Sequence, residues 1–128
     1  MTNATITFDS RGLADLLDAS SQEQLDALDF GVIGFDADTN VQRYNAAESQ
    51  AAGLSPQRVI GEPLFTNVAP CLNNFMVAQR FEDAAVEASE LDDTIDYVLT
   101  LRMRPIKVKL RLLASAAGTT RYVLVQRR

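Results

Sequence analysis

The amino-acid sequence predicts an α+β fold with a five-stranded antiparallel sheet, connecting helices on one face and an N-terminal helical cap on the other. The order of expected elements is two strands, then helices, then three strands. The last third of the chain alternates apolar and polar residues with the period of a half-buried strand. Acidic residues gather toward the N-terminus and basic residues toward the C-terminus, which favours contact between the two parts.

The composition is that of an ordinary globular domain. Of the 128 residues, 47% are hydrophobic and 23% are charged, and this length suits one domain. Within it we expect residues 1–29 to form the cap and residues 30–128 to form the core that contains a binding pocket.

Residues 11–29 are expected to form two short amphipathic helices. Ser20 or Ser21, ahead of Glu23, offers an N-cap for the second helix. The leucines that recur at helical spacing are Leu13, Leu16, Leu17, Leu25 and Leu28.

Residues 30–44 predict a β-hairpin. A turn at residues 36–40 separates the two strands, and Val41 and Tyr44 belong to the second. The apolar residues of the first strand are Phe30, Val32, Ile33 and Phe35.

Residues 45–53 predict a helix that begins after the cap residue Asn45 and stops at Gly53. Glu48 then lies one helical turn beyond Tyr44, so the two side chains can approach the same point. Prolines and glycines in residues 54–71 predict short helical turns and loops. A longer helix is expected from Val77 to Leu91.

The C-terminal third predicts three strands. TIDYVLTLRM (94–103) and IKVKLRL (106–112) alternate cleanly and are joined at Arg104 and Pro105. RYVLVQRR (121–128) follows a turn at residues 117–119.

The charge distribution predicts ion pairs within the molecule. All 17 acidic residues and four basic residues lie in residues 1–96, whereas residues 97–128 hold eight basic residues. The net charge of −5 opposes a nucleic-acid partner. We expect the acidic cap to lie against the sheet face that carries Lys107, Lys109 and Arg111.

Several classes of function are disfavoured. With Cys71 as the only cysteine and no histidine, the chain cannot form an internal disulfide, a Cys/His zinc cluster or a histidine-dependent triad. No phosphate loop, dinucleotide fingerprint or calcium loop is present, so neither a metal nor an enzymatic activity is expected. No apolar run approaches the ~20 residues that cross a bilayer, and residues 1–10 lack a secretory pattern. We therefore expect a cytoplasmic protein without a membrane partner.

Three segments resemble the photoactive yellow protein family: DFGVIGFDADTNVQRYNAAE (29–48), VIGEPLFTNVAPC (59–71) and RMRPIKVKL (102–110). The pair YNAAE and VAPC at this separation is specific, and the resemblance covers nearly the whole chain. It implies the PAS fold, in agreement with the element order, and a blue-light photoreceptor.

The resemblance implies that Cys71 carries p-coumaric acid (4-hydroxycinnamic acid) as a thioester. Tyr44 and a protonated Glu48 would hydrogen-bond its phenolate. Light would cause trans–cis isomerisation, proton transfer from Glu48, a signalling rearrangement and thermal recovery assisted by Met103. The residues implied to bind the cofactor are Cys71, Tyr44, Glu48, Ala52, Leu54, Ala69, Pro70, Tyr97, Leu99 and Met103.

Two positions depart from the best-known pattern of that family. Ala52 stands where the pattern has a threonine that bonds the tyrosine, and Leu54 stands where it has an arginine. Ala52 cannot support Tyr44 through a hydroxyl, so a smaller hydrogen-bond network is expected.

Two other functions stay open on the sequence alone. A PAS-type ligand-binding or protein-interaction module would leave Cys71 as a buried, inert residue. A carboxylate-dependent enzyme would need paired acids in a cleft, and the sequence suggests no such pair. A photoreceptor also implies a downstream signalling protein, and we expect a monomer or weak dimer.

Overall fold

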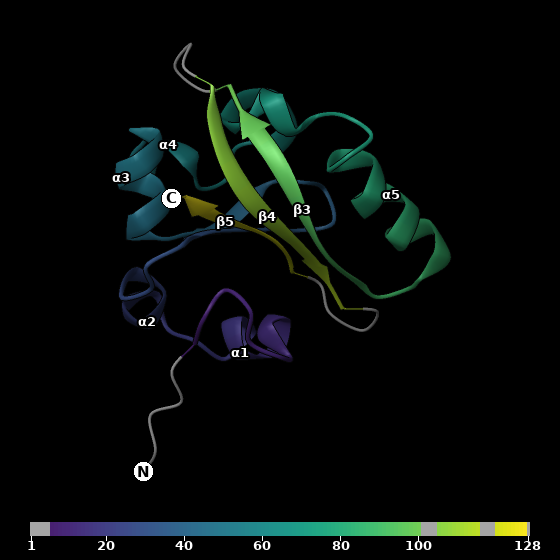
Figure 1. Ribbon diagram of the computed structural model, residues 1–128, viewed down its shortest axis with the longest axis horizontal. Coiled ribbons are helices and arrows are strands. Elements are labelled where there is room, and N and C mark those ends of the chain that lie inside the picture. The colour runs from purple at the N-terminus through teal and green to yellow at the C-terminus, as the bar shows by residue number, and fades with distance from the viewer. Residues whose placement is uncertain (1–5, 101–104, 116–119, 128) are drawn as a thin grey trace.

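Five strands form one antiparallel sheet in the order β2-β1-β5-β4-β3 in the computed structural model, which describes residues 6–100, 105–115 and 120–127. Figure 1 shows β3 and β4 as a long pair beside β5. The strands are β1 (Gly31–Phe35), β2 (Val41–Tyr44), β3 (Leu91–Leu99), β4 (Ile106–Ala114) and β5 (Arg121–Arg127). The predicted fold class is confirmed.

The predicted β1–β2 hairpin is confirmed, and the Asp36 side chain stabilises its turn. Its Oδ1 accepts hydrogen bonds from the amides of Asp38 (2.9 Å) and Asn40 (3.0 Å), a local arrangement that aspartate favours in turns. Thr39 takes a positive φ of 66° within this turn.

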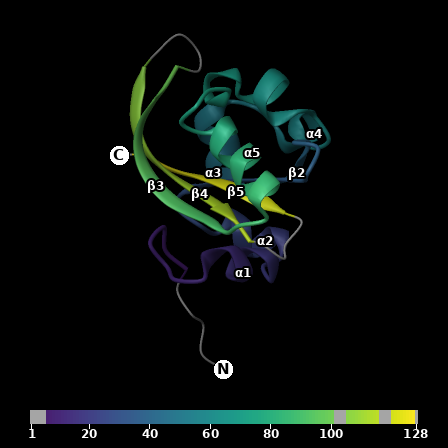
Figure 2. The same cartoon turned by 90° about the vertical axis from the view of Figure 1, so that its right-hand side faces the viewer.

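The connecting helices cover one face of the sheet, and Figure 2 shows them opposite α1 and α2. They are α3 (Ala46–Ala52), α4 (Pro56–Val59), a π-helical turn η1 (Leu64–Val68), a 3₁₀ turn η2 (Pro70–Leu72) and α5 (Ala78–Glu87). Asn45 caps α3, and Gly53 ends it in the left-handed conformation (φ 74°), as predicted.

The predicted helix from Val77 to Leu91 is wrong at its C-terminal end. Ala88 adopts a left-handed conformation with φ 51° and ends α5 at Glu87. Leu91 is already the first residue of β3 and pairs with Ala114, so this strand begins three residues earlier than predicted.

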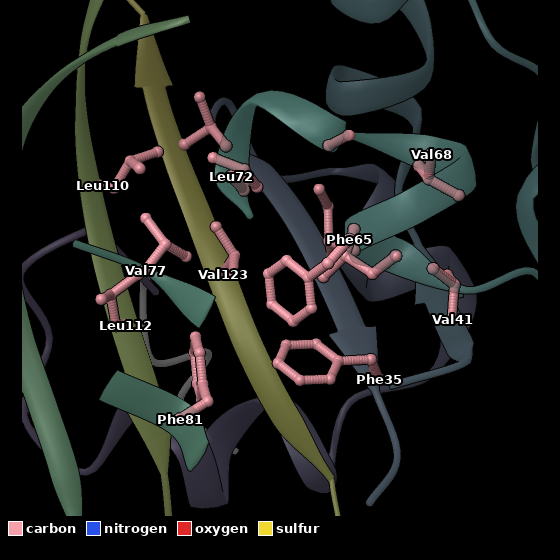
Figure 3. Close-up of a cluster of buried hydrophobic side chains, with 14 of the residues drawn as sticks. Phe35, Val41, Phe65, Val68, Leu72, Val77, Phe81, Leu110, Leu112 and Val123 are labelled. Carbon is pink, nitrogen blue, oxygen red and sulfur yellow. The ribbon is translucent and has the colours of Figure 1, made fainter. Parts of the chain in front are cut away.

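The main core lies between the sheet and the connecting helices, and part of it is drawn in Figure 3. Phe35 forms edge-to-face contacts with Phe65 and Phe81, with ring centroids 5.5 and 4.9 Å apart. Branched side chains of β4 and β5, including Leu110, Leu112 and Val123, complete this core.

The N-terminal segment packs on the opposite face through α1 (Leu13–Asp18) and α2 (Gln22–Asp26), the two predicted helices. Ser21 caps α2, and its capping box is closed by Gln24 rather than by an acid. A second core of buried side chains results, formed by Phe8, Leu13, Leu17, Leu25, Phe30, Val32, Leu113, Tyr122 and Leu124.

The predicted contact between the cap and three basic residues is right for one of them. Arg111 is 7% exposed and donates to the carbonyls of Phe8 (2.9 Å) and Ser10 (2.8 Å). Lys107 and Lys109 are exposed, because the cap docks on the apolar surface nearer the other end of β4. Internal pairing of charge is confirmed where Arg111 binds Asp92 at 2.8 Å.

Candidate functional site

Tyr44 and Glu48 lie on either side of the junction between β2 and α3, and both are buried. Tyr44 is the last residue of β2 and Glu48 lies in the first turn of α3. Their exposed fractions are 1% and 2%, which is unusual for a glutamate. A buried carboxyl group needs polar partners, so its surroundings define the site.

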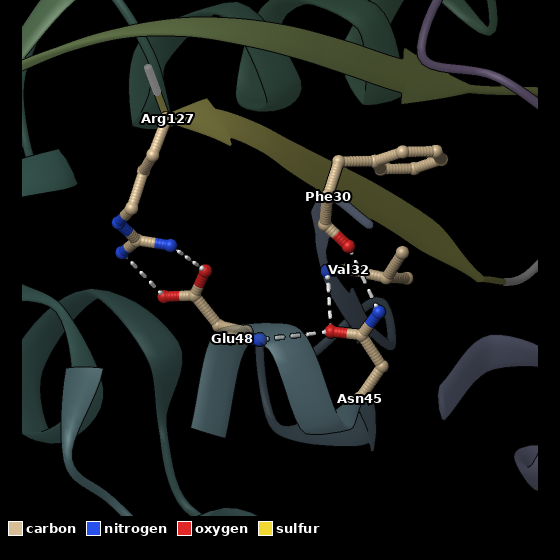
Figure 4. A network of polar contacts seen from close by, with 5 residues as sticks. All are labelled: Phe30, Val32, Asn45, Glu48 and Arg127. Atoms are coloured by element: carbon tan, nitrogen blue, oxygen red, sulfur yellow. Dashed lines mark hydrogen bonds and ion pairs between the residues drawn. The ribbon is translucent and has the colours of Figure 1, made fainter. Parts of the chain in front are cut away.

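The Asn45 side chain fixes the backbone at this point. Its Oδ1 accepts hydrogen bonds from the amides of Val32 (2.9 Å) and Glu48 (3.1 Å), and its Nδ2 donates to the carbonyl of Phe30 at 2.9 Å. Figure 4 shows these contacts joining α3 to β1. Asn45 is fully buried, so the N-cap also sets the depth of Glu48.

Gly31 makes room for the Glu48 carboxylate. A Cβ at position 31 would lie 2.1 Å from Glu48 Oε1. Two non-bonded atoms cannot lie so close, so one of them would have to move. The site therefore requires glycine at position 31 of β1.

Arg127 is the site residue that the sequence reasoning missed. Its Nη1 and Nη2 donate to Oε1 and Oε2 of Glu48 at 2.8 and 3.1 Å, the two-pronged contact in Figure 4. An ionised carboxylate makes a two-pronged contact of this kind. The protonated Glu48 that the resemblance implies is expected in the state with a bound phenolate. The signal in the sequence was the excess of basic residues in the C-terminal strands.

The Tyr44 hydroxyl is held in its neutral form. Burial raises the pKa of Tyr44 well above the ordinary value, the negative charge of Glu48 raises it further, and Arg127 partly opposes both. The Tyr44 side chain can therefore donate a hydrogen bond through its hydroxyl.

Cys71 lies on η2, a half-buried turn at the border of the main core. The Tyr97 hydroxyl donates to the Cys71 carbonyl, and Asn74 Nδ2 donates to the Tyr97 oxygen at 2.5 Å. A surface groove of about 690 Å³ opens beside this turn, lined by Asn74, Met76, Asp96, Tyr97, Val98, Lys107 and Val108.

The structure gathers most of the other predicted binding residues around the same core. Leu54, Cys71 and Tyr97 pack against the buried cluster that contains Tyr44, Ala69 and Leu99. Ala52 is buried on α3, whereas Pro70 is exposed on η2. Met103 lies outside the described residues.

These residues fit a thioester-linked phenol. Cys71 supplies a thiol at the edge of the apolar core, Tyr44 supplies a buried hydroxyl donor, and the buried Glu48 carboxyl group would donate in its protonated form. Within residues 6–100, 105–115 and 120–127, no three His, Cys, Asp or Glu side chains gather as metal ligands. The same part of the chain contains no helix long and apolar enough to span a membrane.

Comparison with known proteins places the chain among its relatives. Residues 25–126 match the family model described as "PAS fold". The chain is 36% identical to the photoactive yellow protein of Rhodothalassium salexigens over 90% of this chain and 88% of that one. It is 32% identical to the photoactive yellow protein of Halochromatium salexigens, covering 95% and 97%.

A solved structure extends this similarity to three dimensions. The photoactive yellow protein domain of the sensor histidine kinase Ppr from Rhodospirillum centenum superposes with a TM-score of 0.81 at 33% identity, covering 88% of this chain and 98% of that one. Sequence and fold agree, and the chain belongs to the photoactive yellow protein family.

Proposed function

We propose that this protein is a blue-light photoreceptor that carries p-coumaric acid as a thioester on Cys71. Family membership supports a sensory, non-enzymatic role. The observation that supports the chemistry best is the burial of two oxygen-bearing side chains, Tyr44 and Glu48, at the border of the main core.

In this proposal Tyr44 and a protonated Glu48 both donate hydrogen bonds to the phenolate oxygen. A buried anion costs several kcal/mol unless it is hydrogen-bonded, and two O–H donors offset that cost. The hydroxyl of Tyr44 has the neutral state that donation requires. Ala52 adds no hydroxyl, so these two donors carry the contact.

The bound chromophore would supply absorption of blue light and a trans–cis isomerisation. Glu48 then releases the carboxyl proton to the phenolate oxygen, which becomes a neutral phenol while Glu48 becomes a carboxylate. A lone buried charge is costly, so the new carboxylate would have to change its contacts, and this change could shift a packed structure between two arrangements.

The cap, residues 1–29, is the element that we propose to move relative to the core, residues 30–128. Gln22 Nε2 donates to the Tyr44 carbonyl at 3.0 Å, and the Ala46 amide donates to Asp26 Oδ1 at 2.8 Å. These bonds flank the site on both sides of Asn45. Release of α2 would expose cap and sheet surface to a downstream protein in the cytoplasm.

Reconstitution tests the proposal. The purified protein without chromophore is mixed with activated p-coumaric acid, and visible spectra are taken before and after a blue flash, with Cys71→Ser alongside. A visible band that needs Cys71, bleaches and recovers supports the proposal. A band that is absent, or present in Cys71→Ser, would favour a PAS-type ligand-binding or interaction module.

Recovery in darkness tests Met103. We expect Met103→Ala to slow recovery of the visible band after a flash. Recovery at the wild-type rate would assign Met103 to core packing.

A further inference from the structure

The buried Glu48 carboxylate has a dedicated cationic partner at the far end of the sequence. Glu48 lies on α3 and Arg127 on β5, and the two charged groups meet through two hydrogen bonds of 2.8 and 3.1 Å. The side chain of Glu48 is 3% exposed and that of Arg127 is 20% exposed. The pair is therefore an internal ion pair rather than a surface contact.

Within the described residues, the hydrogen bonds of the Arg127 guanidinium go to Glu48. Its Nε is buried without a hydrogen-bond partner within the described part of the chain, so the guanidinium is held through its contact with Glu48. The ionisable groups that the structure places at this point are Tyr44 from β2, Glu48 from α3 and Arg127 from β5. Among the described residues, Arg127 is the cation that forms an ion pair with Glu48.

We propose that Arg127 is the counter-ion of Glu48 in the states where Glu48 is ionised, and that chromophore binding breaks this pair. The inference rests on the proposed function for its second half. Without chromophore, Arg127 holds Glu48 as a carboxylate. On binding, the phenol of the chromophore would give its proton to the Glu48 carboxylate, and the protonated Glu48 would then donate its hydrogen bond to the phenolate. After proton transfer the carboxylate returns to Arg127.

The physical reason is the cost of a lone buried charge. A guanidinium is always protonated in proteins and its fork matches both carboxylate oxygens, so it stabilises Glu48 only when Glu48 is ionised. Removing one partner of such a pair strands the other. Arg127 is a positioning residue that favours the proton-transferred state, with no contact to the reacting phenol required.

Infrared spectroscopy of the chromophore-free protein tests the first half. At neutral pH the wild type is expected to show no protonated-carboxyl stretching band from Glu48. Arg127→Gln is expected to show one, and the band should vanish in Arg127→Gln with Glu48→Gln. Arg127→Lys keeps the charge and should suppress the band. Absence of the band in folded Arg127→Gln would overturn the proposal.

A matched control removes a different ion pair. Arg80 binds Asp93 at 2.8 Å with side chains 39% and 50% exposed, so Arg80→Gln breaks a surface pair and should leave the Glu48 signal unchanged. Circular dichroism establishes that each variant is folded. Should Arg127→Gln fail to fold, Arg127→Lys should still fold, and adding Glu48→Gln to Arg127→Gln should restore folding because no lone charge is then buried. Failure of both variants to fold would overturn the proposal.

Flash photolysis of the chromophore-loaded protein tests the second half. Arg127→Gln should shorten the life of the bleached state by about tenfold or more, since a hydrogen bond to a charged group contributes about 1.5–3 kcal/mol. An unchanged lifetime would overturn this half. Failure of the chromophore to attach would reject the proposed function, while the infrared result would still stand.

Discussion

Asn45 Nδ2 donates a hydrogen bond to the carbonyl oxygen of Leu25 at 2.9 Å, and this bond joins the first turn of α3 to α2 of the cap. The same side chain accepts the amide of Glu48. Asn45, which accepts the amide of Glu48, is thus also bonded to the cap. A displacement of α3 would therefore strain or break its hydrogen bond to α2.

Replacing Asn45 should destabilise the fold. Asn45→Ala removes an N-cap and leaves two buried carbonyls, of Leu25 and Phe30, without this donor, at a cost of about 2–4 kcal/mol. Urea denaturation measures the loss, and amide exchange should speed up at Val32 and Glu48. The exposed Asn73→Ala is the control, and an equal loss there would contradict this account.

Gly31→Ala should disturb Glu48 specifically. The added methyl meets Glu48 Oε1 at 2.1 Å, and overpacking of this kind costs about 1–3 kcal/mol. In a Glu48→Ala background the 2.1 Å contact is absent and only the contact with Cβ of residue 48 at 3.2 Å remains, so the same change should cost less. Thermal unfolding of the four proteins gives the coupling. Equal costs in both backgrounds would remove Glu48 as the cause.

Tyr97→Phe should make Cys71 more reactive. The substitution removes the hydroxyl that bonds the Cys71 carbonyl and should loosen η2 with little change in apolar packing. A thiol reagent such as DTNB should therefore react several-fold faster in the chromophore-free protein. Cys71 is the only cysteine, so Cys71→Ser provides the blank. An unchanged rate would mean that this hydroxyl does not hold the turn.

Arg43→Gln should loosen the cap. Arg43 donates to the carbonyls of Leu17 (2.6 Å) and Ser20 (2.5 Å), and bonds from a charged donor contribute about 1.5–3 kcal/mol. Limited proteolysis should then cleave residues 11–29 about tenfold faster or more. The exposed Arg58→Gln on α4 controls for loss of charge, and should be cleaved at the wild-type rate.

Stability should fall in acid partly through Asp92. The hydrogen bond from Arg111 lowers the pKa of Asp92 below its ordinary value of 3.8, although burial acts in the opposite direction. A carboxylate with a lowered folded pKa stabilises the fold above the unfolded value and loses that contribution as the pH falls through the folded value. The side chain is 54% exposed, so solvent screening keeps the contribution small.

Melting temperatures measured from neutral pH down to about pH 2 test this expectation. Asp92→Asn should melt lower than wild type at neutral pH, and the difference should shrink once the pH falls below the ordinary aspartate pKa of 3.8. Asp93→Asn, which loses the exposed contact with Arg80, should show a smaller difference. A constant difference for Asp92→Asn at every pH would exclude linkage through this carboxyl.

The fold was predictable because its signals are local. Alternation marked β4 and β5, and Asn45 and Gly53 marked both ends of α3. The end of α5 was missed because Ala88 carries no sequence sign of a left-handed conformation. Lys107 and Lys109 were wrongly predicted to contact the cap. The part of the sheet that the cap covers depends on side-chain packing, and the alternation of apolar and polar residues does not reveal it.

The site was predictable only in part. The four-residue spacing placed Tyr44 beside Glu48, and the resemblance pointed to the distant Cys71. The partner of Glu48 was out of reach, because Arg127 meets it across 79 positions of sequence. The requirement for Gly31 was likewise out of reach, because it arises from contact with the Glu48 side chain and not from a turn.

Strand β5 is the last strand in sequence and the middle one in the sheet, where it alone joins the β1–β2 and β3–β4 hairpins. During synthesis both hairpins leave the ribosome before it, each with an inner edge of unpaired backbone groups. The sheet closes only when β5 arrives and pairs with β1 across most of the chain. Folding of the nascent chain should therefore wait until β5 has been synthesised, and the pairing of β5 with β1 should give it a high contact order.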